Sequence, residues 1–214
     1  MNKKRVAFFT ISMRRGGAER VVANLCNYLC DKYEVHLLLC ENAIDYTLDR
    51  RVQVSFISDG KDIGSEVKKL LVIPFYAGRL RTWLKTNKID IFFSFLFRPN
   101  VIAVLAKRSK DKLAKVVISE RSNPWLQYAG RSIKGLINRF LIRNVYPDAD
   151  LITVNSFGSK YALQHYYNIS GEKIDIIRNP VSTAFHNSSE QRVGDKFVYV
   201  SVGRMDSGKN HIVL

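Results

Sequence analysis

The sequence predicts an α/β fold built on a doubly wound, Rossmann-like parallel sheet. Short apolar runs alternate with amphipathic segments along most of the 214 residues. The apolar runs are continuous rather than alternating, as in strands that are buried on both faces of a parallel sheet. Hydrophobic residues make up 46% and charged residues 25% of the chain, which is the composition of a globular protein with a large core.

The first quarter of the chain predicts a βαβ unit. Residues 5–12 and 34–40 are apolar runs of strand length. Between them, apolar side chains recur at helical spacing over residues 18–31, so a helix should cover the sheet there. The crossover is expected to be right-handed, and the run 52–57 supplies the next strand.

The middle of the chain continues the alternation. Residues 61–86 are predicted to be mostly helical, with a kink or break at Pro74. The run 89–95 is a strand, residues 100–108 a helix, and the run 115–119 the next strand.

The pattern extends to residue 177. Residues 132–146 form a basic amphipathic helix, and residues 151–154 a strand. Residues 156–167 form a helix that Ser156 can cap, and residues 173–177 the last strand of this domain. Strands that alternate with helices in this way favour a parallel sheet.

The sequence divides into two domains of unequal extent. Residues 1–181 are predicted to form the Rossmann-like domain, and the polar residues 182–195, which lack a period, are expected to be a linker. The apolar run 196–202 then starts a new strand. Residues 196–214 are therefore expected to open a second domain, of which the chain holds only the beginning.

The chain is strongly basic, with 34 Lys and Arg against 19 Asp and Glu and a net charge of +15. Nucleic acid, an anionic membrane surface and phosphorylated substrates are the partners that suit such a charge. The amino terminus shows no signal-peptide cleavage site, and no apolar run reaches the ~20 residues that span a bilayer. We therefore expect a cytoplasmic protein, which can also be peripheral on the inner face of the membrane.

Cysteine and histidine usage argues against a metal site. The cysteines are expected to be core thiols in a reducing cytosol. They are Cys26, Cys30 and Cys40. The histidines show no ligand spacing and no Ser or Cys partner, so neither a metal centre nor a catalytic triad is expected. They are His36, His165, His186 and His211.

Gly16 and Gly17 lie between the first strand and the first helix. Ligands of open α/β sheets bind outside the carboxyl ends of the strands, and paired glycines let the backbone approach a ligand closely. The free N–H groups of a helix start favour an anion. A tight turn without a ligand fits the same residues. Neither the Gly-x-Gly-x-x-Gly fingerprint nor a Walker loop is present, so NAD and ATP sites lose their main support.

Arg204 and Lys209 flank a turn that follows a buried strand and precedes an apolar helix start. Side chains five residues apart across a turn can converge on one group, and a diphosphate suits the pair of an Arg fork and a Lys point charge. Two solvated surface cations are the alternative.

Glu120 and Arg121 follow the strand 115–119, at the same edge of the sheet as Gly16. Adjacent opposite charges in an extended segment cannot face each other, so each should meet another group. A sugar hydroxyl or a phosphate would suit, and a salt bridge to a neighbouring loop is the alternative. Arg98 and Asn100 follow the strand 89–95 in the same manner, with a weaker signal.

Cations and apolar residues also share the predicted helix 132–146 and the segment 61–88. A basic amphipathic surface can lie on anionic lipid headgroups. An ordinary helix that covers the sheet and keeps its basic side in water is the alternative.

Five short motifs, in order along nearly the whole chain, make the sequence resemble a family 4 glycosyltransferase with the GT-B fold. They are Gly-Gly-Ala-Glu-Arg-Val at residues 16–21, Ile-Ser-Glu-Arg at 118–121 with Asn123 and Pro124, Ala-Asp-Leu-Ile-Thr-Val-Asn-Ser at 149–156, Ile-Arg-Asn-Pro-Val at 177–181, and Val-Gly-Arg-Met-Asp-Ser-Gly-Lys at 202–209.

The resemblance implies two Rossmann-like domains, of which the first binds the acceptor and the second a nucleotide sugar. It implies transfer with retention of configuration, without a metal or other cofactor. By motif match, Gly16, Gly17, Arg204 and Lys209 should contact the donor diphosphate, and leaving-group charge would be stabilised there. Glu120 and Arg121 are the catalytic candidates near the transferred sugar. The candidates on the acceptor side are Arg98, Asn100 and Asn123.

The resemblance also has departures. Ser182 stands where an Asp is common in the family, and the paired glutamates that hold the donor fall beyond residue 214. We therefore expect residues 1–214 alone to be inactive. The expected function is sugar transfer to a lipid-linked glycan in surface polysaccharide synthesis. The alternatives are a sugar-nucleotide epimerase of the same build and a basic module that binds nucleic acid or anionic lipid without catalysis; nucleic acid is not the expected partner.

Overall fold

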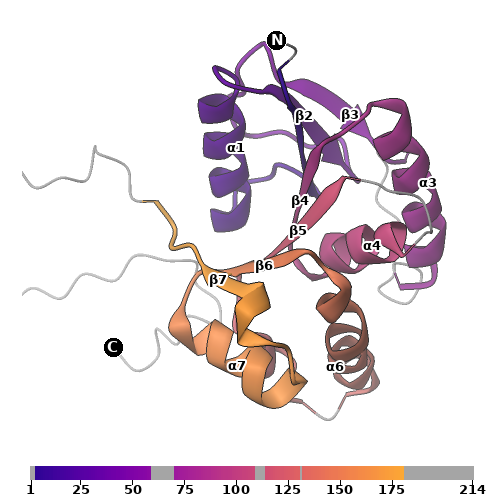
Figure 1. Ribbon diagram of the computed structural model, residues 1–214, viewed down its shortest axis with the longest axis vertical. Helices are drawn as coiled ribbons and strands as arrows, with labels where there is room; N and C mark the ends of the chain where they lie inside the picture. Colours follow the sequence, from indigo (N-terminus) through magenta and orange to yellow (C-terminus); the bar gives the residue numbers. More distant parts are fainter. Residues whose placement is uncertain (1–2, 59–69, 109–113, 131, 181–214) are drawn as a thin grey trace, which may run out of the picture. The chain divides into compact units, whose positions relative to one another are not determined.

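The computed structural model describes residues 3–58, 70–108, 114–130 and 132–180 (Figure 1). The described residues all belong to one compact unit, which ends at Pro180. The predicted linker 182–195 and the predicted strand and turn of residues 196–214 lie outside the described residues. No described helix is both long enough and apolar enough to traverse a lipid bilayer.

A parallel sheet of seven strands forms the centre of the described unit, in the order β3-β2-β1-β4-β5-β6-β7. The strands are β1 (Arg5–Thr10), β2 (Glu34–Leu39), β3 (Gln53–Phe56), β4 (Ile91–Phe95), β5 (Lys115–Glu120), β6 (Leu151–Val154) and β7 (Ile174–Ile176). The order reverses between β1 and β4, and ligands of open α/β sheets bind outside the carboxyl ends of the strands at such a point. The predicted doubly wound α/β fold is confirmed.

Helices cover the two faces of the sheet (Figure 1). The main helices are α1 (Gly17–Leu29), α3 (Ile73–Thr86), α4 (Phe97–Lys107), α6 (Ile133–Val145) and α7 (Phe157–Tyr167). The shorter ones are α5 (Pro124–Gln127) and the single 3₁₀ turns Tyr146–Asp148 and Gly171–Lys173. Figure 1 shows α1 on one side of the sheet and α3, α4 and α6 on the other.

Each face of the sheet has its own hydrophobic core, because successive side chains of a strand point to opposite faces. In β1, Phe8 packs in the core under α1, and its neighbour Phe9 packs in the larger core under α3, α4 and α6. The two rings are at most 1% exposed. Continuous apolar runs are therefore needed to fill both faces.

Two prolines explain the helix boundaries that differ from the sequence pattern. Pro74 lies in the first turn of α3, so the expected break comes just before this helix. The helix predicted from residue 100 begins at Phe97 instead, with Pro99 in its first turn. Proline is tolerated there because the first N–H groups of a helix have no partner within it. The short helix α5 was not predicted; Asn123 caps it by accepting from the backbone N–H of Trp125 and Leu126.

Candidate functional site

Glu120 is the last residue of β5 and is buried at the carboxyl edge of the sheet, with 2% of its surface exposed. The hydroxyl of Tyr146 donates to Oε2 of Glu120 at 2.9 Å. The backbone N–H of Arg121 donates to Oε1 at 3.1 Å, and the hydroxyl of Ser122 lies 3.0 Å from the same oxygen. These groups hold the carboxylate in one orientation.

A chain of buried hydrogen bonds connects this carboxylate to Tyr146, Asn100 and Ser94. Ser94 donates to Oδ1 of Asn100 at 2.8 Å, and Nδ2 of Asn100 donates to the carbonyl of Ser119 at 3.0 Å and to the Tyr146 hydroxyl at 3.4 Å. The Tyr146 hydroxyl thus accepts from Asn100 and donates its own hydrogen to Glu120. Asn100, expected on the acceptor side, is fully buried and supports Tyr146 from behind.

The surroundings of Glu120 act on its ionisation in opposite directions. Burial raises the pKa of Glu120 above its ordinary value, although the hydrogen bonds from Tyr146 and Ser122 oppose the rise. Burial and the nearby carboxylate also raise the pKa of Tyr146, which therefore stays a donor. Displaced carboxyl pKa values are common where a carboxyl group exchanges a proton with a ligand.

A pocket of about 350 Å³ opens beside Glu120. Its volume falls within the ~300–1,000 Å³ of ligand sites. The wall combines two aromatic rings, two cations and two amides, supplied by α4, α5 and α6 and the residues next to them. These residues are Phe97, Tyr128, Arg98, Lys134, Gln127 and Asn138. Two carboxylates, those of Glu41 and Glu120, share the wall with the two cations. Stacking surface and hydrogen-bonding side chains together suit a sugar.

Buried polar atoms without a partner gather at the same edge of the sheet. Within the described residues, the buried side-chain atoms that lack a hydrogen bond are Thr10 Oγ1, Arg98 Nε, Arg121 Nε and Asn138 Oδ1. Thr10 ends β1, Arg121 follows β5, and Arg98 and Asn138 line the pocket. Because leaving such an atom unpaired costs about 1–3 kcal/mol, their concentration here points to a ligand that supplies the missing partners.

Arg121 points away from this pocket. Its guanidinium group donates to Oδ1 of Asn179 and, at 3.4 Å, to the hydroxyl of Ser119. It lines a second, mainly apolar pocket of about 550 Å³ with Phe8 of β1 and Tyr28 of α1. Glu120 and Arg121 therefore have different partners, and the structure does not bring them together in one pocket.

The glycine pair lies where β1 joins α1, with Gly16 as the N-cap and Gly17 as the first helical residue. The Tyr46 hydroxyl accepts from the N–H of Gly16 at 3.0 Å and donates to its carbonyl at 2.8 Å. A methyl group on Gly16 would collide with Oε2 of Glu19, whereas Gly17 faces open space. Since Tyr46 takes the N–H of Gly16, an anion would meet the N–H groups that follow it in the first turn of α1.

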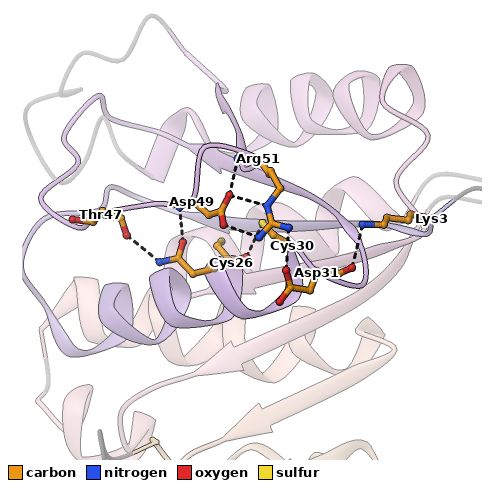
Figure 2. Close-up of polar contacts among 8 residues, drawn as sticks. Lys3, Cys26, Cys30, Asp31, Thr47, Asp49 and Arg51 are labelled. Carbon is orange, nitrogen blue, oxygen red and sulfur yellow. Dashed lines mark hydrogen bonds and ion pairs between the residues drawn. The ribbon is translucent and has the colours of Figure 1, made fainter. Parts of the chain in front are cut away.

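Polar contacts fasten the segment after Tyr46 to α1 (Figure 2). Asn27 of α1 donates to the carbonyl of Thr47 at 3.0 Å and accepts from the N–H of Asp49 at 2.8 Å. Arg51 pairs with Asp49 at 2.7 Å, and its hydrogen bonds hold the pKa of that carboxyl well below its ordinary value. These contacts fix the segment after Tyr46 and so help to hold the Tyr46 hydroxyl next to Gly16.

The structure brings Glu120 and Arg98 together in one pocket, with Asn100 directly behind it. Asn123 serves as the cap of α5. Gly16 and Gly17 lie at the same edge of the sheet, and Arg204 and Lys209 lie outside the described residues. Among the described residues, no three His, Cys, Asp or Glu side chains gather as a metal site.

Sequence reasoning missed Tyr46, Tyr146 and Asn138. Asn138 had a usable signal, since it lies four residues before Ile142 on the buried face of α6, where a polar side chain is unusual. Tyr46 and Tyr146 reach their partners across 30 and 26 residues of sequence, and no local pattern predicts such contacts.

Comparison with known proteins decides the family. The family model of Glycosyltransferase Family 4 matches residues 15–185. The chain belongs to glycosyltransferase family 4. Sucrose-phosphate synthase from Thermosynechococcus elongatus has the same fold, with a TM-score of 0.67 at 10% identity over 82% of this chain and 48% of that one. The fold is that of the GT-B glycosyltransferases.

Two curated relatives come from Campylobacter jejuni. One is N-acetylgalactosamine-N,N'-diacetylbacillosaminyl-diphospho-undecaprenol 4-alpha-N-acetylgalactosaminyltransferase, which is 37% identical over 99% of this chain. The other, GalNAc-alpha-(1->4)-GalNAc-alpha-(1->3)-diNAcBac-PP-undecaprenol alpha-1,4-N-acetyl-D-galactosaminyltransferase, is 28% identical over 98% of it. The chain spans 58% and 55% of the length of these relatives.

Proposed function

We propose that the natural protein with this sequence transfers a sugar from a nucleotide sugar to a polyprenyl-diphosphate-linked glycan in surface polysaccharide synthesis. Family membership and the relatives, whose names describe transfer to undecaprenol-linked acceptors, support transfer over the epimerase and over a binding module without catalysis. The relatives extend well beyond the region they share with this chain, so we also propose that residues 1–214 alone do not transfer the sugar.

We propose that the Glu120 pocket holds the acceptor glycan. The observation that carries this proposal is the coincidence of a buried carboxylate with Asn138 Oδ1 and Arg98 Nε, which lack partners, in one pocket. Hydroxyl and acidic groups of a glycan can donate to the amide oxygen or accept from the guanidinium group. The stacking surface of Tyr128 and Phe97 suits the apolar face of a sugar ring.

In the proposed reaction, an acceptor hydroxyl forms a bond to the anomeric carbon as the bond to the donor diphosphate breaks. The electron pair leaves with the diphosphate, and we assign to Glu120 the removal of the hydroxyl proton. Its raised pKa brings it nearer to the range of an effective base. Arg204, Lys209 and the N–H groups next to Gly17 would stabilise the leaving diphosphate, with retention of configuration and without a metal.

A kinetic comparison of two asparagines on α6 tests the acceptor site. Asn138 is 3% exposed and lines the pocket, whereas Asn144 is exposed and donates to the carbonyl of Phe140. Asn138→Leu should raise the KM for acceptor about tenfold, the effect of ~1.4 kcal/mol, without changing the KM for donor. Its stability should be equal or higher, because an unpaired buried oxygen is removed.

Asn144→Leu is the matched control and should leave both KM values unchanged. An unaltered acceptor KM in Asn138→Leu would show that the acceptor binds elsewhere. Absence of transfer to any polyprenyl-diphosphate glycan from a panel of nucleotide sugars would overturn the proposed reaction itself.

A further inference from the structure

Helix α6 exposes a continuous apolar stripe. Ile133, Leu136, Ile137 and Phe140 follow one another at positions i, i+3, i+4 and i+7, so they share one helix face. Their exposed fractions run from 40% for Ile137 to 78% for Ile133. We call these four residues the α6 stripe. The other side of the helix is the one that packs on the core.

The stripe is larger than the scattered apolar residues of an ordinary surface. Single exposed apolar side chains are common, whereas a row of four on one helix marks a contact surface. Leu126 of α5 is also 71% exposed. Arg139 of α6 donates to the carbonyl of Tyr128 at 3.0 Å and so holds the end of α5 beside α6.

The charge around the stripe is of one sign. Residues 131–147, which comprise α6 and its neighbours in sequence, contain four Lys and Arg and no Asp or Glu. On α6 itself, Lys134 and Arg143 are exposed. A helix with apolar residues on its exposed face and cations beside them, and without carboxylates, is complementary to anionic lipid headgroups over an acyl layer.

We propose that the α6 stripe binds the surface of an anionic bilayer, with its apolar side chains at the boundary of headgroups and acyl chains and with Arg143 on lipid phosphates. A protein partner would need an acidic rim around an apolar groove, and a second copy of this chain would bring the same cations together. The lipid surface is the partner that accommodates both the apolar row and the uniform charge.

The stripe adjoins the candidate acceptor pocket. Lys134 and Asn138 of the same helix line the pocket beside Glu120. A bilayer that contacts α6 would therefore present a lipid-linked glycan to this pocket at the membrane surface. This consequence rests on the proposed function, whereas the lipid binding does not.

Vesicle flotation of residues 1–214 tests the proposal without any sugar substrate. The vesicles are phosphatidylcholine alone or with 30% phosphatidylglycerol, at 0.1 M and 0.5 M salt. The test variant is the double substitution Ile133→Glu with Phe140→Glu, whose side chains are exposed. The control is Tyr28→Glu with Ile177→Glu, two exposed residues at the apolar pocket on the α1 side.

The wild type and the control should float with phosphatidylglycerol vesicles, less so at high salt, and the stripe variant should lose at least tenfold in partition. Arg143→Glu should lose less of its vesicle partition than the stripe variant does. High salt should cause a similar loss in the wild type. Equal flotation of stripe variant and wild type, or no preference for anionic vesicles, would overturn the proposal. A stripe-dependent dimer that does not bind vesicles would overturn it in favour of a second copy.

A further readout separates this proposal from the proposed function. Transfer to a short-chain, water-soluble acceptor by the natural protein should be the same in the stripe variant and the wild type. If that transfer is absent in both proteins while vesicle binding behaves as expected, the proposed function is wrong and the proposal that the α6 stripe binds lipid is supported.

Discussion

The hydroxyl of Tyr146 is the group whose removal tests the site most informatively. Tyr146→Phe deletes one oxygen atom from a fully buried side chain and leaves the ring in place. Glu120 Oε2 then loses its donor at 2.9 Å, and Nδ2 of Asn100 loses an acceptor at 3.4 Å. No cavity larger than the hydroxyl arises, so the effect reports the hydrogen bonds.

The expected loss of stability follows from the charge of the acceptor. Hydrogen bonds to charged groups are worth about 1.5–3 kcal/mol, against about 0.5–1.5 kcal/mol for neutral pairs. We expect Tyr146→Phe to lower the free energy of unfolding by about 2 kcal/mol at pH 7. For a domain of this size, that corresponds to a fall in Tm of about 4–8 °C.

The loss should depend on pH. The pKa of Glu120 is already raised in the folded state, so its unfavourable ionisation lowers stability as pH rises from the ordinary value of 4.5 to the folded pKa. The hydrogen bond from Tyr146 opposes that rise, so its removal raises the folded pKa further and extends the decline to higher pH. The difference between variant and wild type should therefore be small near pH 4.5 and grow toward neutral pH.

Urea unfolding of wild type and variant at several pH values measures this difference. Tyr167→Phe is the matched control, because the buried Tyr167 hydroxyl donates at 3.1 Å to the neutral carbonyl of Pro124. Its cost should be about 1 kcal/mol and independent of pH over this range. A loss below about 0.5 kcal/mol for Tyr146→Phe, or one as flat with pH as that of the control, would refute the argument that Tyr146 stabilises the ionised Glu120.

Three other predictions concern the surroundings of the site. Tyr46→Phe removes both side-chain hydrogen bonds from Gly16, so hydrogen exchange of the Gly16 amide should speed up at least tenfold and the donor KM should rise while the acceptor KM does not; an unchanged exchange rate would contradict the bracing role. Burial raises the pKa of Cys26 and raises that of Cys40 to about 12, so both thiols should react with Ellman's reagent only after unfolding; fast reaction in the native state would show that they are accessible. Arg51 lowers the pKa of Asp49 below its ordinary 3.8, so the stability that this carboxylate contributes is present above pH 3.8 and is lost as pH falls. Acid unfolding of Asp49→Asn should lack this pH-dependent loss of stability, and unfolding curves identical to those of the wild type would contradict the prediction.

The sheet was predictable because local pattern and topology agree in this chain. Continuous apolar runs such as that of β1 occur where both faces of a strand are covered, and the helical repeat of α1 places its apolar residues on one side. The helix boundaries near Pro74 and Pro99 do not follow from local pattern, since proline breaks a helix in its interior but is tolerated in its first turn. Sequence alone does not say which.

The candidate site was predictable only in part, because several of its contacts depend on tertiary packing. Glu120 and Arg98 could be placed at the carboxyl edge because each follows a strand. That Arg121 turns to the other face follows from the period of two, but which of the two charges meets a ligand does not. Tyr146 and Asn138 depend on how α6 packs behind β5, which is a tertiary property. The fold therefore follows from pattern, whereas the site follows from packing.

The most direct test of the central claim, that the Glu120 pocket binds the acceptor glycan, is calorimetric titration of residues 1–214 with a short-chain polyprenyl-diphosphate glycan. Binding needs no donor and no turnover. Wild type should bind, and Asn138→Leu should bind at least tenfold more weakly, while Asn144→Leu should match wild type. Equal affinity of all three proteins would contradict the claim.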